Sequence, residues 1–341
     1  MAKGTMKAFE IQKKGEKPKK VERQIPQPTG RQVQIRVEAC GVCHSDSFLQ
    51  EGGFPGMHYP LIPGHEVIGV IEERGPEVIG RWKVGDRVGV GWHGGHCFHC
   101  DACRHGDFTL CEVGPVPGIT FDGGYAEYMV APEEALARVP TELNSAEAAP
   151  LLCAGITTFN SLRNSGARPG DVVAIQGIGG LGHLAVQFAA KAGFYTVAIG
   201  RTRKSESEAR EFGAKLYLAA EEQDVAKELM ALKGAKVILA TSPSAKSMEP
   251  LLQGLARDGK LVMVGIGDER LNVGIELIMK RASVTGWPSG MATDSEETMN
   301  FAKTNGVRAK IEKFELDRAA EAYDRMFTGQ AHYRAVIVMK K

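Results

Sequence analysis

The chain has 341 residues, and its 42 lysines and arginines nearly balance its 41 aspartates and glutamates, which leaves a net charge of +1. This balance excludes the strongly basic surface that binds nucleic acids or acidic membranes. The length predicts two domains at roughly 150 residues per domain, and a hydrophobic content of 43% is that of an ordinary globular protein.

The sequence predicts neither a membrane-spanning helix nor an N-terminal secretion signal. No apolar run approaches the roughly 20 residues of a membrane helix, and the N-terminal sequence MAKGTMKAFE contains no apolar signal core. We therefore expect a cytoplasmic protein without a membrane partner. In that reducing compartment the seven cysteines indicate metal ligands or free thiols rather than disulfides.

The first part of the chain, up to about residue 155, is rich in glycine and proline and contains short alternating runs. Such runs are typical of strands in an irregular β domain. The predicted strands are residues 33–37, 67–72, 87–90 and 125–130.

From residue 171 onward, short apolar runs alternate with helical segments, which predicts βαβ units and a parallel sheet. Six such strands make a complete dinucleotide-binding sheet. The predicted strands are residues 172–176, 196–199, 216–218, 237–240, 261–265 and 282–285. The predicted helices between them are residues 181–192, 204–212, 224–233 and 246–256.

The last part of the chain, after residue 286, is predicted to contain one helix at 295–304 and a closing strand at 335–339. We expect this tail to return to the first domain. The fold class is therefore α/β, with a β-rich domain of residues 1–154 and 289–341 and a dinucleotide-binding domain of residues 155–288.

A glycine-rich turn follows the strand predicted at 172–176 and opens the next helix. Its sequence is Gly177-Ile178-Gly179-Gly180-Leu181-Gly182, which matches the dinucleotide-binding pattern G-x-G-x-x-G in its proper context. Its first glycine permits a tight turn, its second lets the backbone approach a pyrophosphate, and its third lets helix and strand pack closely. The pyrophosphate would lie at the helix N-terminus. The alternative is a glycine-rich turn that binds no ligand.

The end of the second predicted strand bears on the choice of cofactor. An acidic residue that binds the ribose hydroxyls of NAD is expected here, but the sequence is Gly200-Arg201-Thr202-Arg203-Lys204, with no acidic residue before Glu206. Because a small residue followed by arginine accepts a 2′-phosphate, we favour NADP over NAD, with contacts from Gly200, Arg201 and Lys204. Alternatively, the cations are solvated and NAD binds without its usual carboxylate. Gly265 is a further expected cofactor contact.

Four closely spaced cysteines predict a metal site. Cys97, Cys100, Cys103 and Cys111 have the spacing C-x2-C-x2-C-x7-C, and four thiolates fill all positions of a tetrahedral zinc ion. An iron–sulfur cluster is the rival, but the familiar cluster run has a shorter last spacing followed by proline. We therefore predict a structural zinc. The histidines of the same stretch are expected to be bystanders: His93, His96, His99 and His105.

Three further ligand-type residues, Cys43, His65 and Cys153, are scattered along the chain. Two thiolates and an imidazole would form a zinc site with one open position, as catalysis requires. Each has an ordinary interpretation by itself, since a cysteine in an apolar run such as Cys153 is commonly a small core residue. Their spacing alone does not connect them.

In combination, the motifs resemble those of the zinc-dependent medium-chain alcohol dehydrogenase family, in its microbial and cinnamyl alcohol dehydrogenase-like branch. The likeness covers essentially the whole chain, with the motifs in the family's order. They are Cys43-His44-Ser45-Asp46, Gly64-His65-Glu66 with Gly69, Gly75 and Val78, the four-cysteine run, Gly123-Gly124-Tyr125-Ala126-Glu127-Tyr128, Cys153-Ala154-Gly155-Ile156-Thr157 and the glycine turn.

The resemblance implies a GroES-like catalytic domain, a Rossmann domain and two zinc ions per subunit. It implies that Cys43, His65 and Cys153 bind the catalytic zinc, that Glu66 exchanges onto it, and that Asp46 orients a ligand imidazole. It implies reversible hydride transfer between a primary alcohol or aldehyde and NAD(P) in a homo-oligomer, either a tetramer or a dimer.

Further roles follow from the same resemblance. Ser45 would take the alcohol proton, and Phe48 stands where many relatives have a histidine that completes a proton relay. The remaining implied contacts are His44 and Arg334 with the cofactor phosphates, Thr157 behind the nicotinamide, and Phe48, Trp92 and Trp287 in the substrate pocket.

Two alternatives to this function remain open. The first is a polyol or threonine dehydrogenase of the same superfamily, although polyol enzymes often have Glu as the third ligand where this chain has Cys153. The second is a zinc-binding protein without catalysis, which the complete three-ligand set disfavours.

Overall fold

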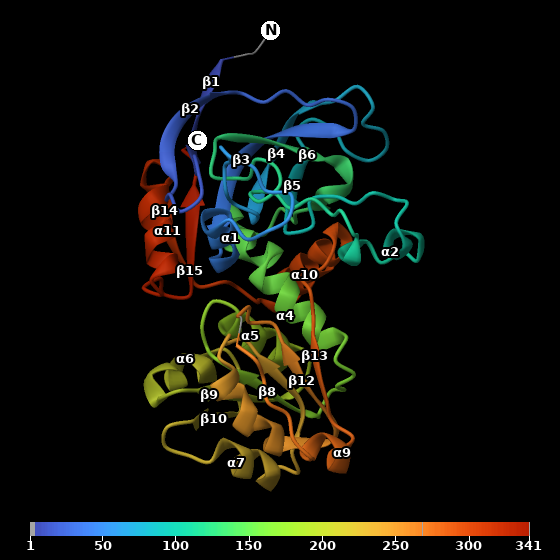
Figure 1. Ribbon diagram of the computed structural model, residues 1–341, viewed down its shortest axis with the longest axis vertical. Helices are drawn as coiled ribbons and strands as arrows, with labels where there is room; N and C mark the ends of the chain where they lie inside the picture. Colours follow the sequence, from blue (N-terminus) through green and yellow to red (C-terminus); the bar gives the residue numbers. More distant parts are fainter. Residues whose placement is uncertain (1–3, 268, 341) are drawn as a thin grey trace. The chain divides into compact units, whose positions relative to one another are not determined.

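The computed structural model describes residues 4–267 and 269–340. The chain divides into two compact units (Figure 1). Unit 1 contains Met1–Ile156 and Ser289–Lys341, and unit 2 contains Thr157–Pro288. The first boundary therefore falls two residues after the predicted one. In the described part of the chain, no helix is both long and apolar enough to span a membrane.

Unit 1 is built around a seven-stranded sheet with the order β14-β15-β3-β4-β5-β7, in which β6 also pairs with β3. All of its strand pairs are antiparallel except β14 with β15. The strands are β3 (Gln32–Val42), β4 (Val67–Arg74), β5 (Arg87–Val90), β6 (Tyr128–Pro132), β7 (Leu136–Arg138), β14 (Ile311–Glu315) and β15 (Arg334–Val338).

A two-stranded hairpin and short helical segments complete unit 1. The hairpin is β1 (Thr5–Glu10) with β2 (Lys19–Gln24), and lysines at its turn and on its strands pair with acidic residues of the C-terminal segment, as Lys17 does with Asp324. The helical segments are η1 (His44–Asp46), α1 (Ser47–Glu51), α2 (Asp101–Arg104), η2 (Phe108–Leu110), η3 (Glu133–Ala135), α3 (Ser145–Ala148), η4 (Ala149–Leu152), α10 (Ala292–Asn305), η7 (Leu316–Arg318) and α11 (Ala319–Phe327).

Unit 2 contains a six-stranded sheet with the order β10-β9-β8-β11-β12-β13, in which every neighbouring pair is parallel. Its central strands are almost wholly buried, as expected where helices cover both faces of a sheet. This confirms the predicted doubly wound architecture. The strands are β8 (Val172–Gln176), β9 (Tyr195–Gly200), β10 (Leu216–Ala219), β11 (Ala235–Ala240), β12 (Leu255–Met263) and β13 (Ser283–Gly286).

The helices of unit 2 differ from the prediction at three places, since α4 (Ala154–Arg163) and α9 (Glu276–Lys280) were not predicted and one predicted helix is broken. The helix expected at 246–256 is instead the short α8 (Ala245–Met248) followed by η6 (Glu249–Gly254), because Pro250 cannot continue an α-helix. As a result β12 begins six residues before the predicted strand. The other helical segments are α5 (Gly182–Lys191), η5 (Arg203–Ser205), α6 (Glu206–Glu211) and α7 (Val225–Ala231), and α4 runs from unit 1 into unit 2.

The prediction for the C-terminal tail was wrong in part. The tail contains the expected helix α10 and strand β15, but also β14 and α11, which sequence analysis did not predict. Helix α11 buries Ala319, Ala322 and Tyr323 and packs on β15. Its buried residues lie on one face at helical spacing, so the sequence carries a helical pattern that the prediction overlooked.

The turn between β8 and α5 has the geometry that its glycines predicted. Gly177 has φ +87°, which favours glycine. A Cβ on Gly182 would clash with the carbonyl oxygen of Gly177, so helix and strand approach too closely for any side chain. Nothing lies within 4 Å of the Cβ position of Gly179, which leaves open space at the centre of the turn.

Alanine substitutions are expected to affect stability differently at Gly182 and at Gly179 of this turn. We expect Gly182→Ala to lower the free energy of unfolding by about 1–3 kcal/mol, as overpacking does. Gly179→Ala is the matched control, with an expected change below about 0.5 kcal/mol. Urea unfolding of the cofactor-free protein measures both, and equal losses in the two variants would contradict the close-packing role of Gly182.

Candidate functional site

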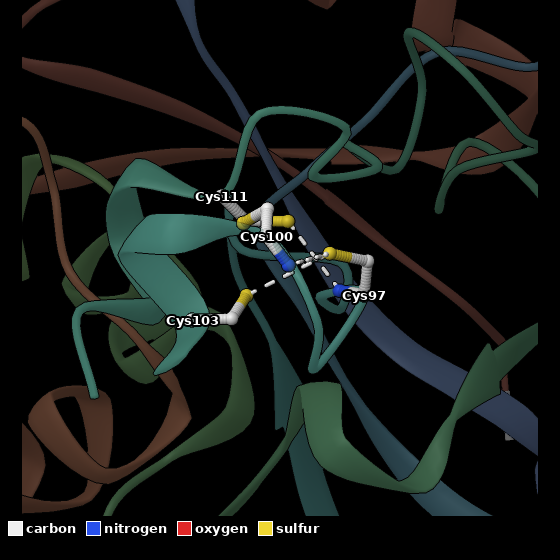
Figure 2. Close-up of side chains that lie close together, drawn as sticks. All are labelled: Cys97, Cys100, Cys103 and Cys111. Carbon is white, nitrogen blue, oxygen red and sulfur yellow. Dashed lines mark hydrogen bonds between the residues drawn. The ribbon is translucent and has the colours of Figure 1, made fainter. Parts of the chain in front are cut away.

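The four cysteines predicted to bind a structural metal converge on one point of unit 1. Their sulfur atoms lie within 4.8 Å of one another, and Figure 2 shows them facing a common centre beside α2. Cys100 caps α2, Cys103 lies within it, and Cys111 follows η2. Four thiols around one point fit a closed tetrahedral zinc site.

Backbone N–H groups lower the pKa of the Cys97 and Cys100 thiols, whereas burial raises the pKa of Cys103 to about 12. The N–H of Cys100 donates to Cys97 Sγ at 3.3 Å, and the N–H of Cys97 donates to Cys111 Sγ at 3.4 Å. Backbone N–H groups of His99 and Cys100 lower the pKa of the Cys97 thiol to about 6. A thiolate is the form that binds metal, so the donor set fits the predicted ion.

The histidines of this stretch differ in their environments. His99 and His105 are exposed, whereas His93 is buried and its Nε2 lies 3.1 Å from His96 Nδ1. His96 in turn stacks on Phe108, with ring centroids 4.0 Å apart. Within the described residues no histidine joins the four-cysteine group.

The second predicted ligand set is also assembled within unit 1. Ligand atoms of Cys43, His65, Glu66 and Cys153 lie within 4.8 Å of one another. Cys43 follows β3, His65 and Glu66 precede β4, and Cys153 follows η4. Residues up to 110 positions apart in the sequence are thus brought together, which their spacing did not reveal.

A buried carboxylate fixes the imidazole of this set. Asp46 and His65 are both fully buried, and Asp46 Oδ1 lies 2.8 Å from His65 Nδ1. Asp46 Oδ2 accepts hydrogen bonds from the N–H of Cys43 and the hydroxyl of Tyr125, each at 2.9 Å. Neither ring nitrogen of His65 makes a hydrogen bond within residues 4–267 and 269–340. Nδ1 has its close contact with Asp46 Oδ1, whereas Nε2 is buried without a partner. A buried imidazole nitrogen left without a partner fits a metal ligand.

The two thiols of the set lie close together and differ in proton affinity. Cys43 Sγ is 3.7 Å from Cys153 Sγ and 3.8 Å from the Ser45 hydroxyl. A hydrogen bond from the Cys153 thiol holds the pKa of Cys43 well below its usual range, and the neighbouring imidazole of His65 adds to this effect. The environment therefore favours a thiolate at Cys43.

Glu66 is fully buried and forms an ion pair with Arg334, which is itself 5% exposed. Burial raises the pKa of Glu66 to about 7 despite the opposing charge of Arg334. A Cβ on Gly41 of β3 would clash with Glu66 Oε2, so Gly41 makes room for this carboxylate. Sequence analysis placed Arg334 at the cofactor phosphates; that role stays a prediction, and its pairing with Glu66 was not foreseen.

Aromatic side chains cover one side of the ligand set. The Trp92 ring meets His65 edge-on at 5.0 Å, and Phe54 meets Trp92 edge-on at 5.9 Å. Phe48 stacks on Phe54. Sequence analysis identified Trp92 and Phe48 but missed Phe54, which lies in a glycine-rich loop without periodicity. Trp287 follows β13 in unit 2, and its place in the pocket stays a prediction.

The predicted cofactor contacts in unit 2 lie at the carboxyl ends of parallel strands, where such sheets bind ligands. Gly200 ends β9, and a Cβ there would clash with the hydroxyl of Tyr217. Arg201 is exposed and lies 3.6 Å from Glu221, and Lys204 is also exposed. Gly265 follows β12, where a Cβ would lie 2.6 Å from the carbonyl carbon of Ser242.

Besides Arg334, two more predicted cofactor contacts lie outside this sheet. Thr157 is on α4, at the start of unit 2. His44 belongs to unit 1, where it is exposed and stacks on Phe327 with ring centroids 5.9 Å apart.

Comparison with known proteins agrees with this arrangement. Residues 29–141 match the family model of the alcohol dehydrogenase GroES-like domain, and residues 180–333 match that of the zinc-binding dehydrogenases. The alcohol dehydrogenase patD of Penicillium expansum is 45% identical over 314 residues, which cover 92% of this chain and 91% of the relative.

Two solved structures share the whole fold. Cinnamyl alcohol dehydrogenase SbCAD4 from Sorghum bicolor has a TM-score of 0.87 at 29% identity and covers 98% of each chain. CAD from Helicobacter pylori, solved in complex with NADP(H), has a TM-score of 0.87 at 28% identity and covers 99% of each chain. This chain therefore belongs to the zinc-dependent medium-chain alcohol dehydrogenase family and is an oxidoreductase of the alcohol dehydrogenase class.

Proposed function

We propose that the chain is a zinc-dependent alcohol dehydrogenase and aldehyde reductase that uses NADP(H) and acts on primary alcohols and their aldehydes. The observation that carries this proposal is the buried ligand set, in which Cys43, His65 and Cys153 converge and His65 Nε2 has no partner within the described residues. Three protein ligands leave a fourth position for substrate, which is the arrangement of catalytic rather than structural zinc.

When bound, zinc supplies Lewis acidity for an alcohol or carbonyl oxygen, and the nicotinamide accepts or delivers the hydride. The chain's own residues provide position and charge. Asp46 holds the imidazole of His65, and the environment of Cys43 favours its thiolate. Glu66 has one oxygen on Arg334 and a second, Oε2, without a hydrogen-bond partner among the described residues. We assign Glu66 as a ligand that exchanges with substrate.

The proton of the alcohol would pass to the Ser45 hydroxyl, which lies 3.8 Å from Cys43 Sγ. Phe48 stacks on Phe54 and cannot carry a proton further. We therefore infer that the proton leaves Ser45 by a route that does not use the side chain at position 48, or that another base serves.

The substrate class follows from the aromatic cover of the ligand set. Trp92, Phe54 and Phe48 form a connected apolar wall, and the partly buried Met57 and Tyr59 belong to the same cluster. Such a wall suits a planar aldehyde or an unbranched primary alcohol and disfavours a polyol, which carries hydroxyl groups that need partners. Polyol dehydrogenases often have a glutamate ligand where this chain has Cys153, which also disfavours a polyol substrate.

The NADP preference rests on the end of β9, after which no acidic residue occurs before Glu206 and three exposed cations follow, Arg201, Arg203 and Lys204. The Helicobacter pylori relative was solved with NADP(H), which supports the same choice. We further propose a cytoplasmic location, because none of the seven cysteines forms a disulfide and metal-binding thiols persist in a reducing compartment.

We also propose a homo-oligomer, dimer or tetramer, that contacts a second copy through unit 2. Strand β13 ends the parallel sheet, and within the described residues no strand pairs with its outer edge. Beside it, α9 and the segment before it expose Val273, Ile275, Ile278 and Met279. An unpaired edge next to exposed apolar side chains favours pairing with another chain.

The two metal sites are predicted to respond differently to loss of a ligand. Cys43→Ser is expected to lower the rate of benzaldehyde reduction by NADPH at least about 100-fold, while the protein stays folded. Loss of a residue that only orients a metal ligand costs about 10–100-fold, and loss of a ligand itself should cost at least as much. Cys103→Ser is expected to cost more than about 3 kcal/mol of stability, since a structural zinc contributes folding energy. Steady-state rates and urea unfolding measure the two effects.

Metal content provides the control for this comparison. The unsubstituted protein should hold two zinc ions per chain, and each variant should retain about one, as measured by plasma mass spectrometry. A chelator should abolish turnover by the unsubstituted protein. Full activity in Cys43→Ser, or no turnover of any alcohol or aldehyde by the metal-loaded protein, would contradict the proposed function.

The cofactor preference is tested at Arg201, with Arg203 as its matched control. Arg201→Ala is expected to lower kcat/KM for NADPH about tenfold and to change that for NADH less than about twofold, because the loss of a charged contact to the 2′-phosphate costs about 1.4 kcal/mol. The Arg203 guanidinium is already bonded to Glu206 and Glu222. Arg203→Ala should therefore leave the ratio of kcat/KM for NADPH to kcat/KM for NADH unchanged. A preference of the unsubstituted protein for NADH would refute the assignment.

The proposed contact between copies is tested at Ile278, which is 77% exposed. Ile278→Glu places a charge in the apolar patch and is expected to reduce the molar mass measured by sedimentation equilibrium to that of a smaller assembly. Ile79 is 71% exposed on unit 1, so Ile79→Glu is a matched control that should leave the mass unchanged. An unaltered mass in Ile278→Glu would exclude this face.

A further inference from the structure

Tyr125 is fully buried in unit 1 and lies in the Gly123–Tyr128 motif, to which no role has been assigned so far. Its hydroxyl donates to Asp46 Oδ2 at 2.9 Å. The same carboxylate contacts His65 Nδ1 through its other oxygen. A chain of contacts thus runs from the tyrosine hydroxyl through one carboxylate to the imidazole of the candidate catalytic metal site.

The backbone of Tyr125 is tied to the segment that carries His65. The N–H of Tyr125 donates to the carbonyl of Pro63 at 3.0 Å, and the N–H of Gly124 donates to that of Gly64 at 3.0 Å. On its other side the carbonyl of Tyr125 accepts a hydrogen bond from Phe9 at 2.8 Å. The position of Tyr125 relative to His65 is therefore set by the backbone.

The ring of Tyr125 packs directly over Gly64, the residue before His65. A Cβ on Gly64 would lie 2.5 Å from Tyr125 Cδ1, and Gly64 has φ +109°, so both the space and the backbone angle require glycine. The ring and the hydroxyl thus act at two different places. The ring fills the space above Gly64, and the hydroxyl reaches Asp46.

We propose that Tyr125 is a positioning residue, whose hydroxyl orients the Asp46 carboxylate and thereby sets the affinity of the Cys43–His65–Cys153 site for Zn²⁺. The inference rests on the proposed function, since it requires this set to bind zinc. Of the two donors on Asp46 Oδ2, the N–H of Cys43 belongs to the adjacent turn, and Tyr125 is the donor that approaches from a distant segment. Without it, the carboxylate keeps one donor on that oxygen and is free to rotate away from His65.

A tyrosine that served only to fill the core could be replaced by phenylalanine without effect on the metal. The contrast is therefore Tyr125→Phe, which keeps the ring over Gly64 and removes only the hydroxyl. Tyr323→Phe is the matched control, because Tyr323 is also fully buried and donates its hydroxyl to Gln50 at 2.8 Å, outside the ligand set.

The experiment measures Zn²⁺ affinity by competition with a chromophoric chelator, and the zinc that belongs to this site is identified as the fraction lost in Cys153→Ser. Tyr125→Phe is expected to weaken this site about tenfold, at the low end of the 10–100-fold range for partners outside the first ligand sphere. Tyr323→Phe should change it less than about twofold. In an Asp46→Asn background Tyr125→Phe should have no further effect, because both changes break the same chain.

Three outcomes would overturn the inference. An affinity in Tyr125→Phe equal to that of Tyr323→Phe would reduce Tyr125 to a core residue. A full effect of Tyr125→Phe in the Asp46→Asn background would show that it does not act through Asp46. If the unsubstituted protein holds no zinc fraction that Cys153→Ser removes, the proposed metal site fails, and the inference fails with it.

Discussion

The carboxylate of Asp46 contacts the imidazole of His65, the backbone N–H of Cys43 and the hydroxyl of Tyr125, and all of these groups are buried. Burying a carboxylate costs free energy unless hydrogen bonds and charges compensate it. Those partners come from the turn after β3, the segment before β4 and the motif before β6. The requirement to satisfy one buried group therefore brings three distant segments together. Two of them carry Cys43, His65 and Glu66, and Cys153 comes from a fourth segment, after η4.

Local chemistry allowed several features to be predicted from the sequence. The glycine turn of Gly177–Gly182 combines a positive φ angle with a close helix–strand approach, and each demand selects glycine at a fixed spacing. The four cysteines lie within one short loop, so spacing alone indicated their convergence. The central strands β8 and β11 were identified because their burial on both faces leaves continuous apolar runs.

Other features depend on contacts between residues far apart in sequence, which local patterns do not encode. The set of Cys43, His65 and Cys153 could be connected only through the family resemblance. The pairing of Glu66 with Arg334 joins residues 268 positions apart, and its one local trace is Gly41, a glycine in a strand that makes room for a carboxylate. Helix α11 is a different case, because its buried residues have helical spacing and this local pattern was overlooked.

We infer that the protein has two kinds of metal site: a closed one that stabilises a loop and an open one that performs the chemistry. Zinc-edge anomalous scattering from crystals of the zinc-loaded protein tests this separation most directly. We expect two anomalous-difference peaks per chain. One lies among Cys97, Cys100, Cys103 and Cys111, and the second is bounded by Cys43, His65 and Cys153. A single peak at the four cysteines, with no density at the buried set, would contradict it.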